Sequence, residues 1–311
     1  MPKVAEAFSP GGISSFFEIC DGGHDGKPLC DLERVGARGG GFVIDKGVQT
    51  RVEVEETEKN LIDVFINDKL SPEAETSRTV AESLLAETPK KHKATIRHKI
   101  EIPIGAGFGS SAGGALGTAL SLSEALSLNL TYNQLGRIAH VAEIKCKTGL
   151  GTVGPIMLGG CIITVEPGGP GIGVIDRIPL TSRYFVVTGT FGPTATKQIL
   201  LSPEKKREVN RWGKKTLDKI LDEPSLENFL ACCYEFAEKT GFMTKRVREL
   251  CQLAKRAGAI GSAQNMVGEA IHAITFEENA ESITEAFKKV LPNEKILKSK
   301  IDFQGARLIK P

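Results

Sequence analysis

The chain has 311 residues, of which 41% are hydrophobic and 25% charged, and its formal net charge is +2. This is the composition of a globular protein with room for two domains, and the balanced charge gives no reason to expect nucleic acid as a partner. The first residues, MPKVAEAF, lack the apolar core of a signal peptide, and no run of about 18 apolar residues occurs. We therefore expect a cytoplasmic protein that neither spans nor binds a membrane.

Seven cysteines occur, an odd number without a Cys-x-x-Cys pair, which fits neither a disulfide framework nor a zinc ribbon. A bridge between Cys20 and Cys30 is one alternative. Free thiols without a catalytic role are the expectation.

Strands are expected through the first 67 residues. VAEAF and ISSFFEIC flank a turn at residues 10–12, and the alternating stretch 41–56 precedes LIDVFIND, which together predict an antiparallel meander. Ser71, followed by Pro72, is typical of a helix N-cap and predicts a helix to about Leu85. KATIRHKIEIP then predicts a further strand.

An amphipathic helix is predicted after Thr131, followed by the glycine-rich turn TGLGTVGPIMLGG and the strand CIITVEP. EPGGPGIG is interpreted as a hairpin loop. After the strand YFVVTGTF we expect helices between about residues 194 and 256, broken near Pro203, Pro224 and Gly241, then two short strands around a loop in GAIGSAQNMVGEAIHAITF, and a helix in AESITEAFKKVL. The fold class is α+β in two halves.

The segment PIGAGFGSSAGG lies between a predicted strand and a predicted helix. Its alternating glycines permit close approach to the backbone, and the amides and dipole of a helix start attract phosphate oxygens. It is not a Walker A loop, because no lysine precedes the serines, and it does not fit the dinucleotide fingerprint. By spacing alone, a nucleotide phosphate site and a tightly packed structural turn both remain open.

The same segment resembles the central motif of the GHMP kinases, and AFSPGGISSFFEI and RAGAIGSAQNMVGEAIHAI resemble two further signatures in the same order. Within this superfamily the chain is most similar to the archaeal pantoate kinases, through VGARGGGFVIDKGV, AHVAEIKCKTGLGTVGPIMLGG and GTFGPTATKQIL, over nearly its whole length. The resemblance implies two GHMP kinase domains: a ribosomal-S5-like α/β domain with a mixed antiparallel sheet (residues 1–180) and a ferredoxin-like α+β domain (residues 181–311).

The resemblance also implies ATP and Mg²⁺ as cofactors. The residues expected to surround the triphosphate are Pro103, Gly105, Gly107, Phe108, Gly109, Ser110, Ser111 and Ala112. Ser111 and Glu143 would ligate Mg²⁺, since hydroxyl and carboxylate oxygens suit that ion. A solvated helix face is the alternative for Glu143, but the small Ala139 and Ala142 allow a close approach beside it.

Four residues are expected on the acceptor side. The Arg38 guanidinium can bind a carboxylate bidentately, His140 lies one helical turn before Glu143, and Thr194 and Thr196 offer hydroxyls. The alternatives are a surface arginine in a loop, a structural histidine and helix-capping threonines.

Three acceptor-side positions depart from the family. Thr152 stands where the family has a turn aspartate that serves as base, Ala37 replaces a serine, and Thr164 replaces an arginine. Phosphoryl transfer rests mainly on positioning and charge stabilisation, so Thr152 is expected to orient the acceptor hydroxyl without a base.

The implied activity is phosphorylation of a small hydroxy acid, pantoate in that family, on the route to coenzyme A. There are two alternatives: a kinase that acts on another acceptor, such as a mevalonate phosphate, and a homologue that binds nucleotide without catalysis. A homodimer is left open.

Overall fold

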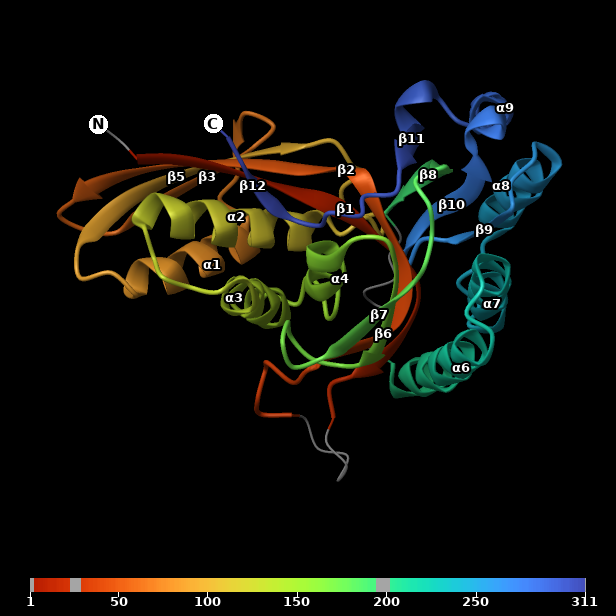
Figure 1. Ribbon diagram of the computed structural model, residues 1–311, viewed down its shortest axis with the longest axis horizontal. Coiled ribbons are helices and arrows are strands. Elements are labelled where there is room, and N and C mark those ends of the chain that lie inside the picture. Colours follow the sequence, from red (N-terminus) through yellow and green to blue (C-terminus); the bar gives the residue numbers. More distant parts are fainter. Residues whose placement is uncertain (1–2, 23–28, 194–201, 311) are drawn as a thin grey trace.

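The computed structural model describes residues 3–22, 29–193 and 202–310, and it contains two sheets with helices packed against each (Figure 1). The first sheet has the strand order β12-β1-β2-β5-β3-β4, with β6 and β7 added along another part of β2. Its strands are β1 (Lys3–Cys20), β2 (Gly36–Thr57), β3 (Leu61–Ile66), β4 (Lys69–Leu70), β5 (Lys91–Ile100), β6 (Cys161–Glu166), β7 (Val174–Ile178) and β12 (Arg307–Ile309).

The second sheet has the order β11-β8-β10-β9. Its strands are β8 (Tyr184–Pro193), β9 (Gly261–Gln264), β10 (Gly268–Phe276) and β11 (Ile296–Lys300), the last preceded by the short 3-10 helix η1 (Asn293–Lys295). Each half thus combines an antiparallel or mixed sheet with helices, which is the α+β class expected from the sequence.

Helices cover one face of the first sheet and the outside of the second (Figure 1). Those with the first sheet are α1 (Glu75–Ala86), α2 (Ser110–Leu126), α3 (Tyr132–Lys145) and α4 (Val153–Leu158). Those beside the second are α7 (Leu226–Lys239), α8 (Lys245–Arg256) and α9 (Glu277–Lys288), and α6 (Pro203–Asp222) packs against α7 and against β1 and β2 of the first sheet. Hydroxyl side chains cap several of them: Thr131 forms a capping box with Gln134 at α3, and Ser202 caps α6 just before Pro203.

The turn expected at residues 10–12 is wrong, because β1 continues through it with only a register shift between Pro10 and Gly11. The two glycines instead allow close approach. A Cβ at Gly11 would lie 2.8 Å from the main-chain oxygen of Lys46, and one at Gly12 would lie 2.6 Å from Ile156 of α4. Glycines within a strand often mark such a bulge and contact.

The predicted meander is also wrong in one pairing. β3 lies parallel to β5, because α1 carries the chain back across the sheet between them. Ser71 does not cap α1: its N–H donates to the oxygen of Val64 and its hydroxyl to that of Lys69, and the helix begins later, at Glu75. Within the described residues, the other predicted strands and helices, including the hairpin β6–β7, occur where the sequence predicts them. Helix α4 was not expected, because it forms inside the predicted glycine-rich turn, and the short strands β4, β11 and β12 were not expected either.

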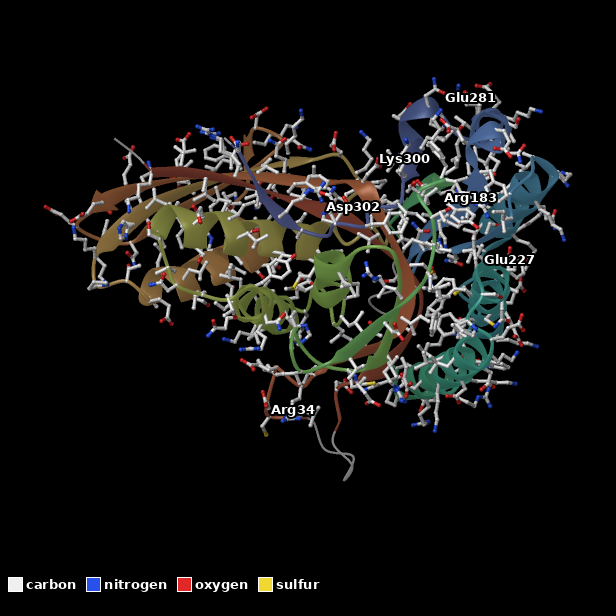
Figure 2. All side chains as sticks on the ribbon, in the orientation of Figure 1. Arg34, Arg183, Glu227, Glu281, Lys300 and Asp302 are labelled. Atoms are coloured by element: carbon white, nitrogen blue, oxygen red, sulfur yellow. The ribbon has the colours of Figure 1, made fainter. Side chains whose placement is uncertain are left out.

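Two apolar clusters form the core. One lies between the first sheet and α1, α2 and α3, and it includes Val52, Leu84 and Leu116. The other joins the second sheet and α6 to α9 to the curved parts of β1 and β2, through residues such as Phe42 and Phe229. Charged residues such as Glu227 on α7 and Glu281 on α9 lie on the outer helices (Figure 2).

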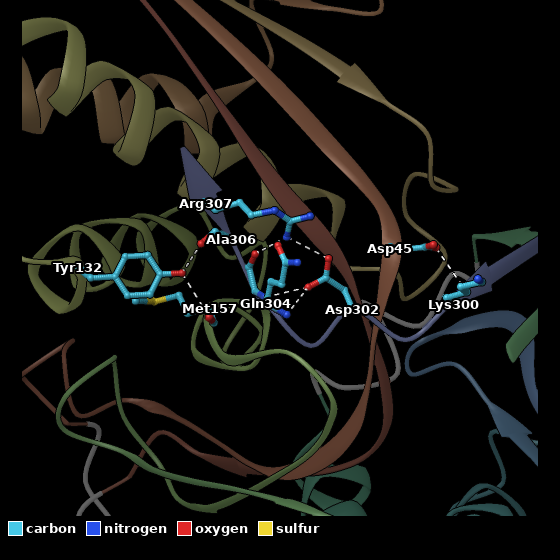
Figure 3. Close-up of polar contacts among 9 residues, drawn as sticks. Asp45, Tyr132, Met157, Lys300, Asp302, Gln304, Ala306 and Arg307 are labelled. Atoms are coloured by element: carbon cyan, nitrogen blue, oxygen red, sulfur yellow. Dashed lines mark hydrogen bonds and ion pairs between the residues drawn. The ribbon is translucent and has the colours of Figure 1, made fainter. Parts of the chain in front are cut away.

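The segment after β11 returns to the first sheet, where β12 pairs with the outer edge of β1. On the way, Asp302 accepts hydrogen bonds from the amides of Gln304 and Gly305 and pairs with Arg307 (Figure 3). The Tyr132 hydroxyl donates to the oxygen of Ala306 at 2.6 Å and lies 3.2 Å from that of Met157 (Figure 3). The returning segment therefore holds α3 and α4 together.

All seven cysteines are free thiols, as expected, so no bridge joins Cys20 and Cys30. Within the described ranges, no helix is both long enough and apolar enough to cross a bilayer. The division into domains at residue 180 stays a prediction.

Candidate active site

The glycine loop adopts a backbone that side chains would disturb. Gly105, Gly107 and Gly109 have φ values of 74°, 82° and 68°, and Gly109 is the N-cap of α2. A Cβ at Gly107 would lie 2.9 Å from the oxygen of Met266, in the loop between β9 and β10. Since glycine has no side chain to cap α2, the first amides of this helix are available to an anionic group.

The loop residues divide into two kinds. Phe108 and Ala112 are buried, each 1% exposed, and the Phe108 oxygen accepts a hydrogen bond from Gly12 at 3.0 Å. Pro103 and Ser110 are half-buried. Phe108 and Ala112 thus anchor the loop by packing, so only their backbone can face a nucleotide, which the sequence did not reveal.

A chain of hydroxyls links the two residues expected to ligate Mg²⁺. Ser111 Oγ donates to Thr76 Oγ1 (3.3 Å), Thr76 Oγ1 lies 3.1 Å from Thr148 Oγ1, and Thr148 Oγ1 donates to Glu143 Oε1 (3.2 Å). These residues come from α2, α1, the turn after α3 and α3 itself. The fold therefore brings Ser111 and Glu143 into one cluster.

Glu143 is buried, which removes the solvated helix face as an interpretation. Burial raises the pKa of its carboxyl to about 7, and hydrogen bonds from the hydroxyls of Ser111 and Thr148 partly oppose that rise. In the described part of the chain no cationic side chain pairs with it. A buried carboxylate beside neutral hydroxyls suits a hard divalent cation.

The oxygen set is incomplete for a metal held by protein alone. Among the described residues, no group of three or more histidine, cysteine, aspartate or glutamate side chains gathers anywhere. One carboxylate and one hydroxyl fit instead a Mg²⁺ ion whose remaining ligands are water and nucleotide phosphates. The residues present therefore fit the expected cofactor pair.

Thr152 lies against the glycine loop. It precedes α4, and its Cγ2 would be 2.8 Å from a Cβ at either Gly109 or Gly12. Gly151 lies beside Ala37, since its Cβ would be 3.2 Å from the methyl of that residue. The turn that carries Thr152 is thus next to the start of α2, and its role toward an acceptor stays a prediction.

His140 is buried, and its Nε2 donates to the oxygen of Val35 at 2.8 Å. Burial lowers the pKa of the imidazole, and the hydrogen bond to Val35 acts against that shift. The ring therefore links α3 to the segment before β2, as expected if His140 is a structural histidine. Contact with an acceptor through the other ring nitrogen stays a prediction.

Arg38 does not have a free guanidinium. Its Nε and Nη2 donate to the two carboxylate oxygens of Glu18, at 2.9 and 2.8 Å, across the β1–β2 pair. Glu18 lies next to α6, because a Cβ at Gly213 would be 3.0 Å from its Cβ. Neighbouring residues of a strand point to opposite faces, so Arg38 points away from the side on which Ala37 meets Gly151.

In this structure the Arg38 fork is therefore engaged by Glu18, and its contact with an acceptor carboxylate stays a prediction. Thr164, on β6, is opposite Gly39 and 7% exposed. Thr194 and Thr196 lie outside the described residues.

Sequence reasoning missed Thr76 and Thr148 as members of the hydroxyl chain. It also missed Asn265, whose Cβ would be 3.1 Å from a Cβ at Gly107 and whose Oδ1 lies 2.8 Å from Nδ1 of His272. Its segment, GSAQNMVG, could have been found, because it belongs to the third GHMP-like motif. The two threonines carry no comparable signal.

Two sheets of this kind, with a glycine loop entering a helix beside a hydroxyl and a buried carboxylate, define a kinase site of the GHMP type. The family model described as "GHMP kinases N terminal domain" matches residues 75–160 of the chain. This range includes the glycine loop, Glu143 and Thr152.

Comparison with known proteins identifies the family to which the chain belongs within the GHMP kinases. The chain is 31% identical to a pantoate kinase of Methanocaldococcus jannaschii, covering 90% of this chain and 96% of the relative. It is 33% identical to that of Thermococcus kodakarensis, covering 89% and 90%. A solved structure described as a phosphotransferase related to the CoA biosynthesis pathway superposes with a TM-score of 0.88 at 29% identity, covering 98% of each chain. The chain belongs to the pantoate kinase family of the GHMP kinases.

Proposed function

We propose that this chain phosphorylates pantoate with ATP, giving 4-phosphopantoate and ADP for coenzyme A synthesis. The observation that carries the proposal is the meeting of the glycine loop, Ser111 and Glu143 in a chain that resembles pantoate kinases from end to end. The reaction would take place in the cytoplasm and needs no nucleic acid or membrane. A homodimer is part of the proposal.

In the proposed reaction, the amides at the start of α2 hold phosphate oxygens of ATP, and Ser111 and Glu143 hold Mg²⁺. The magnesium ion supplies neutralisation of the charge on the phosphates. The bond between the γ-phosphorus and the ADP oxygen breaks, a bond to the acceptor hydroxyl oxygen forms, and the hydroxyl proton passes to water. Thr152 orients that hydroxyl without removing its proton.

One observation supports a different acceptor as the second candidate. Ala37, Thr152 and Thr164 are all uncharged, and Arg38 is paired with Glu18. In the described residues these positions supply no free positive charge for the carboxylate of pantoate. An acceptor with other polar groups, such as a mevalonate phosphate, is therefore kept as the alternative.

A coupled assay of ADP release over a panel of hydroxy acids tests the proposal. Pantoate should give the highest kcat/KM, with 4-phosphopantoate identified by mass spectrometry. If another acceptor is preferred by tenfold or more, the substrate assignment is wrong but the kinase class stands. If ATP binds and no acceptor raises turnover, the chain is a binding protein rather than an enzyme.

A further inference from the structure

The first turn of α1 reaches the predicted metal site through Thr76. Thr76 is 5% exposed, and its hydroxyl lies within hydrogen-bond distance of both Ser111 and Thr148. Through these two contacts, α1 links the α2 side of the cluster, at Ser111, to the α3 side, at Thr148. Thr76 is therefore the middle of the chain that ends at Glu143.

The hydrogen bonds of this chain run in one direction. Ser111 donates to Thr76, and Thr148 donates its single hydroxyl proton to Glu143. Thr148 must then accept from Thr76, because each hydroxyl has one proton to give. The anionic end of the chain favours this order, and hydrogen bonds in such a row strengthen one another. As a result, the lone pairs of Ser111 Oγ stay available to a cation.

The position of α1 is fixed independently of this chain. Ser77, the next residue, bonds to Nε2 of buried His98 at 2.9 Å, and His98 Nδ1 lies 2.9 Å from Thr50 Oγ1. A Cβ at Gly114 of α2 would lie only 3.3 Å from Ser77 Oγ, so α1 and α2 are in close contact here. Thr76 is thus presented to Ser111 by a helix that the sheet itself holds.

We propose that Thr76 is a positioning residue for the divalent cation: it orients the hydroxyls of Ser111 and Thr148 so that the oxygens of Ser111 and Glu143 face one ion together. This inference rests on the proposed function, in which those two residues hold the metal. The Ser111 hydroxyl already lies close enough to Glu143 to act on its carboxyl, so without the Thr76 hydroxyl as acceptor the Ser111 proton would be given to Glu143 alone, and the two ligands would be occupied with each other. Hydroxyls that orient metal ligands typically change metal affinity by about tenfold or more when removed.

The test compares Thr76→Val with Thr76→Ser and with a matched control, Thr79→Val. Thr79 is one turn further along α1, and its hydroxyl lies 3.5 Å from Sγ of Cys146, outside the chain of hydroxyls. The first readout is the affinity for Mn²⁺ in the presence of a non-hydrolysable ATP analogue, measured by electron paramagnetic resonance. The second is the split between kcat and the KM of pantoate.

Thr76→Val should weaken Mn²⁺ binding by about tenfold or more and lower kcat, with the KM of pantoate within about twofold of wild type. Thr76→Ser and Thr79→Val should bind Mn²⁺ as the wild type does. If Thr76→Val is folded by circular dichroism and binds Mn²⁺ normally, the proposal is overturned.

If Thr76→Val does not fold, Thr148→Val replaces it, because Thr148 lies at the surface and its loss does not threaten the core. Normal Mn²⁺ affinity in folded Thr148→Val would also overturn the proposal. The metal measurement does not need pantoate, so a wrong acceptor leaves it intact. A wild-type protein that binds no Mn²⁺ with the analogue would overturn both this inference and the proposed function.

Discussion

Gly149 lies so close to Glu143 that a Cβ at position 149 would be 2.4 Å from Glu143 Oε2. Gly149→Ala should therefore displace the carboxylate and lower kcat by about tenfold or more, with little loss of secondary structure. Gly154→Ala is the control, since its nearest contact is the Cδ1 atom of Ile175, at 2.5 Å, which can rotate away. Steady-state kinetics of the two variants would refute the assignment of Glu143 if both kept wild-type kcat.

Glu143→Gln should be more stable than the wild type at pH 8 when Mg²⁺ is absent. The folded-state pKa of this carboxyl is raised from 4.5 to about 7, so the folded protein binds more protons than the unfolded chain between those values. The contribution of this carboxyl to the free energy of unfolding is fully present below about pH 4.5 and is lost as the pH rises through 7. For a pKa raised this far, the loss is up to about 3 kcal/mol.

Thermal denaturation of wild type and Glu143→Gln from pH 5 to 8, without and with Mg²⁺ and an ATP analogue, measures this effect. The difference in melting temperature should grow with pH in the absence of metal and shrink when metal and analogue are added. Glu143→Gln should also be almost inactive. A difference in melting temperature that stays constant across the pH range would show that burial does not raise the pKa of the Glu143 carboxyl.

Arg38→Lys should lower stability rather than weaken acceptor binding. The substitution keeps the charge but loses the fork that holds both oxygens of Glu18, at a cost of roughly 1–2 kcal/mol for a partly buried pair. Glu18→Gln, which removes the other partner, should behave alike. Melting temperature and the KM of pantoate are both measured. A KM that rises severalfold at an unchanged melting temperature would restore Arg38 to the acceptor site.

Thr152→Ala should lower kcat by about tenfold or less, because it removes one neutral hydrogen bond worth roughly 0.5–1.5 kcal/mol. Thr152→Asp tests the opposite view, in which a missing base limits the rate. If a base were limiting, kcat on pantoate would increase above the pKa of the new carboxylate. We expect a decrease instead, because the turn lies against the start of α2, where an added negative charge would repel phosphates.

The glycine loop could be predicted because its signal is local. Alternating glycines before two serines permit a left-handed backbone and leave the helix start without a side-chain cap, and the hydroxyl cap at Thr131 is equally local. The pairing of β3 with β5 could not be found this way, since it depends on where α1 carries the chain.

The orientation of Arg38 illustrates a second limit. It stands among glycines in GARGGG, so no alternation of apolar and polar residues shows which face of β2 each side chain takes. Thr76 and Thr148 were hidden for another reason. Each is a single hydroxyl far from Ser111 in sequence, and only the packing of α1, α2 and the turn after α3 brings them together.

The pairing of β12 with β1 has a consequence for biosynthesis. Glu6 and Phe8 leave the ribosome long before their partners, Ile309 and Arg307. Until then the outer edge of β1 stays open, and the carbonyl of Ala306 that receives the Tyr132 hydroxyl does not exist. A nascent chain that stalls before Asp302 would therefore expose a strand edge prone to aggregation. Helix α4 would also lack its contacts with the returning segment, although the glycine loop would already have been synthesised.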